Sequence, residues 1–189
     1  MNSMNFLVST LFDLYIMVVL LRVWLQWARA DFYNPFSQFV VKATQPVVAQ
    51  LRRMIPSIAT FDLATVVFAF VLCVVKFFVL QLVVSGGLPL LNVSYLLIGF
   101  IALSKAAGSL LFWVLILRAI LSWVSQGHNP IEFIMIQLTE PLVAPIRRVL
   151  PSFGGLDLSV LVLFVVLQFL NFLIGDLLSP YFGNLWFVL

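Results

Sequence analysis

Four long apolar runs decide what this sequence can fold into. Each is close to 20 residues or longer, the length of an α-helix that crosses a bilayer, and they cover residues 6–27, 63–84, 94–117 and 158–178. Apolar residues make up 63% of the chain and charged residues only 9%, which excludes a soluble globular domain with its usual charge of about 25%. No basic residue precedes the first run, so it is read as a retained span and not a signal peptide. We expect an all-α membrane protein with four transmembrane helices.

The connections between the runs predict how the chain is oriented. Segments 28–61 and 125–156 together hold six of the ten Lys and Arg residues, whereas 85–93 is short and uncharged. Loops rich in Lys and Arg stay on the cytoplasmic side. Both long segments are therefore predicted to be cytoplasmic and both termini to lie on the other side, where the aromatic tail around Trp186 suits the outer interface.

The second half of the chain repeats the first. LLRVWLQWARADFYNPF aligns with ILRAILSWVSQGHNPI at an offset of 96 residues, which becomes 95 after a one-residue gap. The matching positions are Arg22 and Arg118, Asn34-Pro35 and Asn129-Pro130, Pro46 and Pro141, Arg52-Arg53 and Arg147-Arg148, Pro56 and Pro151, and Asp62 and Asp157. The repeats cover 1–93 and 94–189. Because each contains two spans, both enter the membrane in the same direction, as parallel repeats.

The cytoplasmic segments 34–56 and 129–151 are predicted to form short amphipathic helices. Their apolar residues recur at the helical spacing i, i+3, i+4, i+7. In the first copy these residues are Phe36, Phe39, Val40 and Ala43, and in the second Ile131, Ile134, Met135 and Leu138. Asn34 and Asn129 are expected to cap the helices, with a proline at the first helical position. Pro46 and Pro141 are expected to end one short helix and start another, and the helices either lie on the inner interface or dip into it.

The repeated pattern resembles the YggT repeat. The pattern runs from an Arg in the first span through Asn-Pro to Pro-x5-Arg-Arg-x2-Pro-Ser and Asp-Leu, and it occurs twice. The resemblance covers nearly the whole chain and implies a two-repeat protein of the bacterial inner (plasma) membrane without an established enzymatic activity. It also implies an association with osmotic-stress tolerance, while single-repeat relatives are tied to cytochrome assembly and to cell or organelle division.

The matching arginines are the first candidate functional residues. Arg22 and Arg118 lie near the inner ends of their spans, where they are either anchors that snorkel to the headgroups or a paired site between the two halves. The pairs Arg52-Arg53 and Arg147-Arg148 are expected to contact anionic lipid headgroups or a partner.

The aspartates that follow these arginine pairs have a predicted role of their own. Asp62 and Asp157 directly precede the returning spans, where a carboxylate caps the helix and interacts favourably with its dipole. Their spacing from the arginine pairs also predicts an ion pair from Arg52 to Asp62 and another from Arg147 to Asp157.

Four ionisable residues fall within the spans: Asp13, Lys76, Lys105 and Asp176. Buried charges are expensive in a membrane and are therefore paired or functional. Because the four sum to zero, we expect Asp13 to pair with Lys76 or Lys105, and Lys76 with Asp176. Such pairs serve either a structural purpose or an ion path.

Enzymatic chemistry is not expected. Leu173-Ile174-Gly175-Asp176 lacks the first glycine of the Gly-x-Gly-Asp sequence of aspartyl intramembrane proteases, and the one histidine, His128, lies in a turn. A single cysteine excludes an internal disulfide, and no metal-spaced cluster or phosphate loop occurs. We expect no cofactor and, since the net charge of +3 is scattered, no nucleic-acid partner.

Two functions of different classes remain open. The first is a non-catalytic integral membrane protein that organises or assembles inner-membrane complexes, with a role in osmotic or envelope stress. Its partners would be the bilayer with its anionic headgroups, and a membrane protein or a second copy. The second is a small ion channel or transporter whose intramembrane charges line a path between the repeats.

Overall fold

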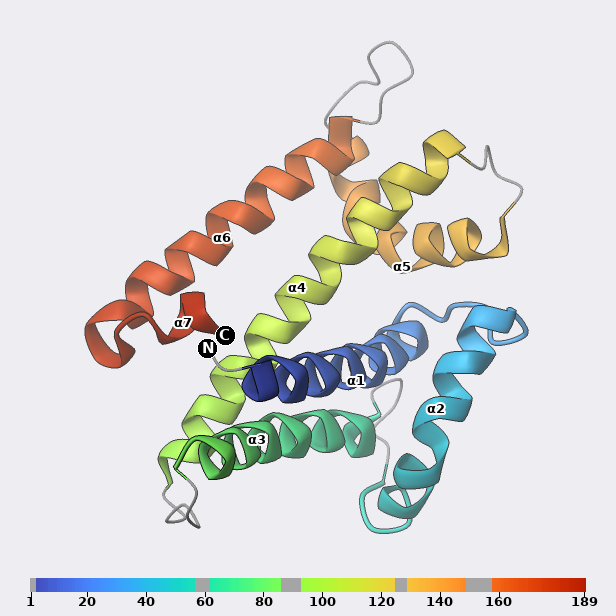
Figure 1. The fold of residues 1–189 in the computed structure, drawn as a ribbon. Coiled ribbons are helices and arrows are strands. Elements are labelled where there is room, and N and C mark those ends of the chain that lie inside the picture. Colours follow the sequence, from blue (N-terminus) through green and yellow to red (C-terminus); the bar gives the residue numbers. More distant parts are fainter. Residues whose placement is uncertain (1–2, 57–61, 86–92, 125–128, 149–157) are drawn as a thin grey trace. The chain divides into compact units, whose positions relative to one another are not determined.

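The chain is built from α-helices, and the computed structural model describes residues 3–56, 62–85, 93–124, 129–148 and 158–189 (Figure 1). Four long helices of this part are apolar enough to cross a membrane. These are α1 (Ser3–Trp27), α3 (Leu63–Ser85), α4 (Ser94–Val124) and α6 (Leu158–Phe182). The predicted all-α membrane fold with four spans is confirmed, although α4 continues seven residues beyond the expected end at 117.

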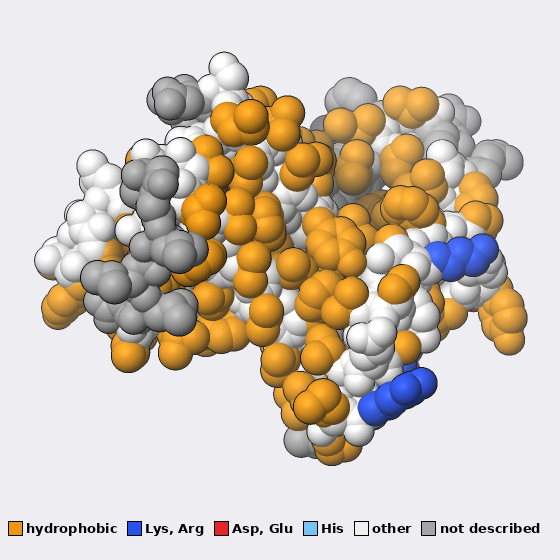
Figure 2. Space-filling model, turned by 60° about the horizontal axis from the view of Figure 1, so that its bottom comes forward, with side chains coloured by type: hydrophobic (Ala, Val, Ile, Leu, Met, Phe, Trp, Pro, Cys, Tyr) orange, Lys and Arg blue, Asp and Glu red, His pale blue; other side chains and the backbone are white. Residues whose placement is uncertain are grey.

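One amphipathic helix connects the two spans of each repeat. These helices are α2 (Pro35–Leu51) and α5 (Pro130–Arg147), and a short α7 (Leu185–Val188) follows α6. Large apolar side chains are exposed along the spans, for example Phe6 at 62%, Phe100 at 64% and Phe169 at 62%. Figure 2 shows one face of the molecule, where hydrophobic side chains cover most of the surface and basic ones appear in few places. Such a surface is suited to lipid and not to water.

The chain divides into two compact units, each with its own core. Unit 1 comprises Met1–Gln26 and Val40–Ala107, and unit 2 comprises Trp27–Phe39 and Gly108–Leu189. Each core joins buried residues of the first span, the amphipathic helix and the returning span. Three pairs match between the repeats, namely Val19 and Leu115, Val48 and Val143, and Phe68 and Leu163. These pairs are 96, 95 and 95 residues apart, so the sequence repeat is also a repeat of packing.

The helices α2 and α5 each continue through their proline, so the prediction of two short helices divided by Pro46 or Pro141 is wrong. A proline removes one amide donor and crowds the preceding turn. In both helices a threonine hydroxyl donates to a carbonyl of that turn, Thr44 to Val40 at 2.8 Å and Thr139 to Met135 at 2.7 Å. These bonds do not replace the one that the proline removes. The residues beyond the proline, Val48 and Val143, pack in the cores of the two units, and this packing keeps each helix continuous.

The buried face of α2 also differs from the predicted one. Its fully buried positions are spaced i, i+3, i+7, i+11 and are occupied by Ser37, Val40, Thr44 and Val48. Phe39, predicted to belong to the apolar face, is 61% exposed. Thr44 takes part in the buried stripe through its hydrogen bonds, whereas the buried Ser37 Oγ has no hydrogen-bond partner in the described part of the chain. The apolar period of the sequence therefore does not identify the buried face of this helix.

The end of the chain turns back onto α6. Gly183 has a φ of 59°, a left-handed conformation that glycine adopts without strain. Gly175 leaves room for the returning segment, because a Cβ there would lie 2.3 Å from the ring of Phe187. Trp186 is 4% exposed and its Nε1 donates to the Asn171 carbonyl at 2.8 Å. Trp186 is therefore buried within the protein, and the prediction that it belongs to an outer aromatic belt is wrong.

Candidate functional site

One buried arginine in each repeat ties the first span to the amphipathic helix. Arg22 of α1 is 4% exposed, and its Nη1 donates to Thr44 Oγ1 of α2 at 2.7 Å. Arg118 of α4 is 8% exposed, and its Nη1 donates to Thr139 Oγ1 of α5 at 2.5 Å. We call these two contacts the arginine brackets. Neither arginine snorkels to the headgroups, because each is buried against the helix of its own repeat.

The second guanidinium nitrogen of each bracket meets a different partner. Arg22 Nη2 donates to the amide oxygen of Gln45 at 2.8 Å. Arg118 Nη2 lies 3.5 Å from the carboxylate of Glu140, whose other oxygen accepts from Arg147 Nη1 at 2.9 Å. Repeat 1 therefore has a charged arginine bound to a neutral side chain, whereas repeat 2 has a carboxylate between two arginines.

The predicted ion pair between Arg52 and Asp62 is present. Arg52 Nη2 lies 2.5 Å from Asp62 Oδ2, and Asp62 is 1% exposed. Asp62 caps α3, since its carboxylate accepts from the Thr65 hydroxyl at 2.5 Å and from the Thr65 amide at 3.4 Å. Burial alone would raise the pKa of Asp62, but the hydrogen bonds from Arg52 and Thr65 hold that pKa below its ordinary value of 3.8.

The matching ion pair of repeat 2 falls outside the described residues, because Asp157 and Pro151 belong to the segment 149–157. His128 also lies outside them. Within the described part, Arg147 binds Glu140, as stated above. The second arginine of each pair is exposed: Arg53 lies just after α2, and Arg148 lies at the end of α5.

Both Asn-Pro motifs begin a helix as predicted. Asn129 Oδ1 accepts from the Ile131 amide at 2.9 Å, with Pro130 in the first turn. Asn34 Oδ1 accepts from the Phe36 amide at 2.9 Å in the same way. Asn34 makes a further contact, because its Nδ2 donates to the carbonyl of Pro130 at 2.8 Å. The first cap therefore also contacts the second amphipathic helix.

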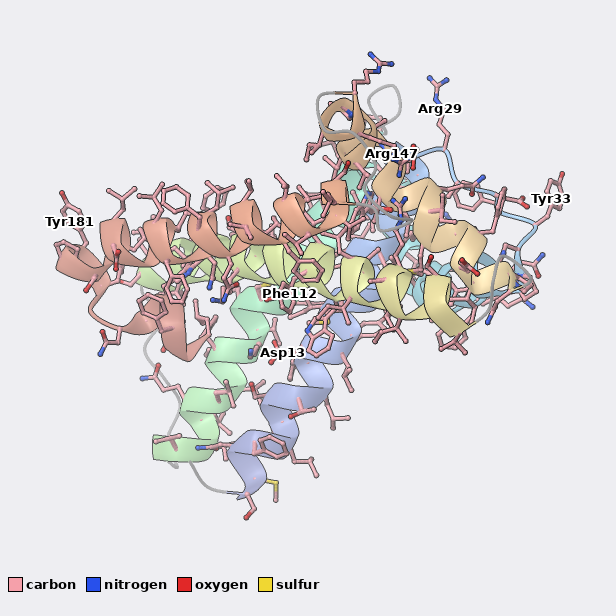
Figure 3. The ribbon with its side chains drawn as sticks, turned by 90° about the horizontal axis from the view of Figure 1, so that it is seen from above. Asp13, Arg29, Tyr33, Phe112, Arg147 and Tyr181 are labelled. Carbon is pink, nitrogen blue, oxygen red and sulfur yellow. The ribbon has the colours of Figure 1, made fainter. Side chains whose placement is uncertain are left out.

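Of the intramembrane charges, Asp13, which is labelled in Figure 3, forms an ion pair between α1 and α3 with Lys76. Lys76 Nζ lies 2.6 Å from Asp13 Oδ1, and the Ser9 hydroxyl donates to Oδ2 at 3.1 Å. Lys76 is only 5% exposed. Lys105 is half-buried on α4, and Asp176 is exposed on α6.

Four residues of the brackets were not predicted as site residues: Thr44, Gln45, Thr139 and Glu140. The repeat alignment pairs the two threonines, and each stands two residues before a proline. This repetition marks the two threonines as positions of interest, but it does not identify the arginines as their partners. The described residues contain no group of three or more His, Cys, Asp or Glu side chains placed to hold a metal ion.

The fold and the brackets define a multi-pass, all-α membrane protein built from two repeats, each with an amphipathic helix fixed to its first span. The CCB3/YggT family model matches this chain twice, over residues 1–83 and 97–178. The chain therefore belongs to the CCB3/YggT family.

Curated relatives match over almost their full lengths. A Vibrio alginolyticus protein named "Uncharacterized protein in proC 3'region" is 66% identical over 189 residues, which is all of both chains. "Uncharacterized protein YggT" of Escherichia coli K12 is 50% identical over 95% of this chain and 93% of its own length. A Haemophilus influenzae protein is 38% identical over 96% of this chain and 94% of its own. No solved structure matches the chain significantly.

Proposed function

We propose that this protein is a non-catalytic scaffold of the bacterial inner membrane that organises or assembles membrane complexes, with a role in osmotic or envelope stress. The observation that carries the proposal is the pair of arginine brackets. Both repeats bury a charged guanidinium in order to hold an amphipathic helix against a span. Burying an arginine is costly unless it is well bonded, so this arrangement supports a role that needs rigidly placed helices.

A rigidly placed helix is suited to recognition. Contacts made from fixed elements lose less conformational entropy on binding than contacts made from loops. Arg53 and Arg148 are exposed at matching positions at or just beyond the ends of α2 and α5. In the proposed topology both helices face the cytoplasm, where each basic residue near anionic headgroups contributes about 1 kcal/mol. The scaffold would thus contact lipid headgroups and a membrane protein from the same surface.

The alternative function is a small channel or transporter. It is favoured by the presence of ionisable residues within the spans, because such residues often mark an ion path. Asp13 and Lys76 are however paired with each other, and both carboxylate oxygens of Asp13 are hydrogen-bonded. A closed pair of this kind supports a structural role within unit 1.

Complementation of a deletion strain with variants of this protein distinguishes the two functions. One variant carries Thr44→Val and Thr139→Val, which keep the shape of the side chains but remove the bracket acceptors. The matched control carries Asp13→Asn and Lys76→Met, which remove the intramembrane pair together. Survival after an osmotic upshift and the assembly of inner-membrane complexes on native gels are measured at equal chain levels.

We expect the bracket variant to lose osmotic tolerance and complex assembly while the control keeps both. The reverse sensitivity would contradict the scaffold role. Ion flux through proteoliposomes of the purified protein, abolished by the control substitutions, would establish the channel in its place.

A further inference from the structure

Four polar side chains form a connected group where the first span of repeat 1 meets its amphipathic helix. Arg22 and Gln26 are one turn apart on the same side of α1. Gln45 and Arg52 are two turns apart at the end of α2, where the Arg52 amide still donates to the Val48 carbonyl at 2.9 Å. Arg22 Nη2 donates to the Gln45 amide oxygen at 2.8 Å, and Arg52 Nη2 donates to the amide oxygen of Gln26 at 3.3 Å. We call Arg22, Gln26, Gln45 and Arg52 the arginine–glutamine group, and all four belong to unit 1.

The arginine–glutamine group carries more positive charge than its neighbouring carboxylate balances. Arg22 is 4% exposed, and within the described part of the chain it bonds only neutral oxygens. Arg52 is paired with the buried Asp62, which balances one of the two positive charges. The two arginines are near enough to repel each other. Because a buried guanidinium without a counterion is costly, this place favours one further negative charge.

Repeat 2 supplies a negative charge at the matching position from its own sequence. An offset of 95 residues relates Gln45 to Glu140. The Glu140 carboxylate lies 3.5 Å from Arg118 Nη2 and 2.9 Å from Arg147 Nη1, so it contacts both arginines at once. Gln45 offers an oxygen at the same position but no charge. At this position the two repeats therefore differ by one negative charge.

The arginine–glutamine group also has hydrogen-bond donors to offer. Each of its glutamines gives the amide oxygen to an arginine, and the NH2 group on the other branch of the planar amide points away from that arginine. Within the described residues neither NH2 group has a hydrogen-bond partner, and neither has Arg52 Nη1. Gln45 and Arg52 are exposed. Donors at the surface of the group are therefore accessible to an anion.

We propose that the arginine–glutamine group of repeat 1 binds one phosphate group. A phosphate combines negative charge with several acceptor oxygens, which match the excess positive charge and the guanidinium and amide donors of the group. Arg22 lies five residues before the end of α1, which is about 7.5 Å along the helix and suits the depth of an anionic phospholipid headgroup. A free phosphate ion has the same chemistry. The site does not depend on the scaffold role.

Binding of lipid and of phosphate to variants of the purified protein tests the site. Gln45→Glu gives repeat 1 the carboxylate of repeat 2 and keeps an oxygen for Arg22, so the variant should stay folded while it excludes the phosphate. Gln50→Glu is the matched control, since Gln50 is exposed on the same helix about 140° away around its axis. Native mass spectrometry in detergent counts the phosphatidylglycerol or phosphatidylcholine molecules that each protein retains. Titration calorimetry without lipid measures the binding of inorganic phosphate.

We expect the wild type and Gln50→Glu to bind one phosphatidylglycerol per chain about tenfold more tightly than phosphatidylcholine, whose choline cancels the phosphate charge. Gln45→Glu should lose this preference, and detergent titration shows whether the variant is still folded. Binding of inorganic phosphate that Gln45→Glu abolishes, without a preference for phosphatidylglycerol, would assign the site to the free ion. The proposal would be overturned if Gln45→Glu bound both probes as the wild type does, if Gln50→Glu lost binding equally, or if the wild type bound neither probe.

Discussion

The two repeats agree at one end of the membrane helices and differ in the middle. Near the amphipathic helices, Arg22 and Thr44 form the same contact as Arg118 and Thr139. In the middle of the spans, repeat 1 has the Asp13–Lys76 ion pair, whereas Ser109 and Asn171 occupy the matching positions of repeat 2. Asn171 instead accepts from Trp186 of the returning tail. The contact that places the amphipathic helix is thus made twice, while each repeat satisfies its mid-membrane polar positions differently.

The largest expected loss of stability comes from breaking the Asp13–Lys76 ion pair, which repeat 2 lacks. Lys76→Leu leaves the Asp13 carboxylate without its cation inside the membrane, and loss of one partner of a buried pair costs about 3 kcal/mol or more. Asn171→Leu at the matching position removes a neutral acceptor of Trp186 and should cost about 1 kcal/mol. Unfolding by titration with a denaturing detergent measures both. Asp13→Asn with Lys76→Met should recover most of the loss, and equal losses for Lys76→Leu and Asn171→Leu would contradict the comparison.

The next largest loss of stability is expected from breaking the arginine brackets, which both repeats share. Thr44→Val and Thr139→Val each leave one donor of a buried guanidinium without its acceptor, at a cost of about 2 kcal/mol. Because the two brackets have the same geometry, the two losses should be nearly equal in the same detergent titration. Thr10→Val on α1 is the matched control, since the Thr10 hydroxyl bonds only within its own helix and the substitution should change little. A loss in one repeat alone would show that the brackets are not equivalent.

A smaller effect should separate the second partners of the brackets. Glu140→Gln removes the carboxylate between Arg118 and Arg147 and should destabilise repeat 2 by about 1 kcal/mol, with part of that loss screened by salt. Gln45→Glu makes repeat 1 resemble repeat 2 and should stabilise it slightly, because Arg22 already bonds the amide oxygen. Measurement of both variants at low and high salt tests the signs. Destabilisation by Gln45→Glu would contradict this reading of the difference.

The smallest effect is a pH dependence at the start of α3. The folded pKa of Asp62 lies below its ordinary value of 3.8, so the stability from Asp62 is fully present above that ordinary value. It is lost as the pH falls through the lower folded pKa. Hydrogen exchange in the first turn of α3 should therefore accelerate only in acid. Asp62→Asn should remove this dependence, and an unchanged acid response in that variant would assign it to other groups.

The sequence predicts the elements better than the contacts between them. The four apolar runs and the in-register Asn-Pro motifs predict the spans and both helix caps, because hydrophobic length and capping are local properties. The Arg52–Asp62 pair also follows, since the two charges are only ten residues apart, one just after α2 and the other just before α3. Pro46 was misread because Val48 packs in the core of unit 1 and continues the helix beyond the proline, a tertiary contact that the proline itself does not reveal.

The brackets could not be predicted for a different reason. Arg22 and Thr44 are 22 residues apart, and whether an arginine near a span end reaches lipid or protein depends on which face of the next helix packs against it. That face includes the polar residues Ser37 and Thr44, so an apolar period does not find it. The return of Trp186 to Asn171 likewise depends on the turn at Gly183, which is not evident from hydropathy.

Hydrogen exchange of the intact protein in lipid nanodiscs should decide whether the brackets hold the amphipathic helices in place. In the wild type we predict strong protection of the α2 and α5 amides. Thr44→Val should speed exchange in α2 and leave α5 unchanged, and Thr139→Val should do the opposite. Rapid exchange of both helices in the wild type, or exchange in α2 that Thr44→Val does not alter, would contradict the bracket as the contact that fixes these helices.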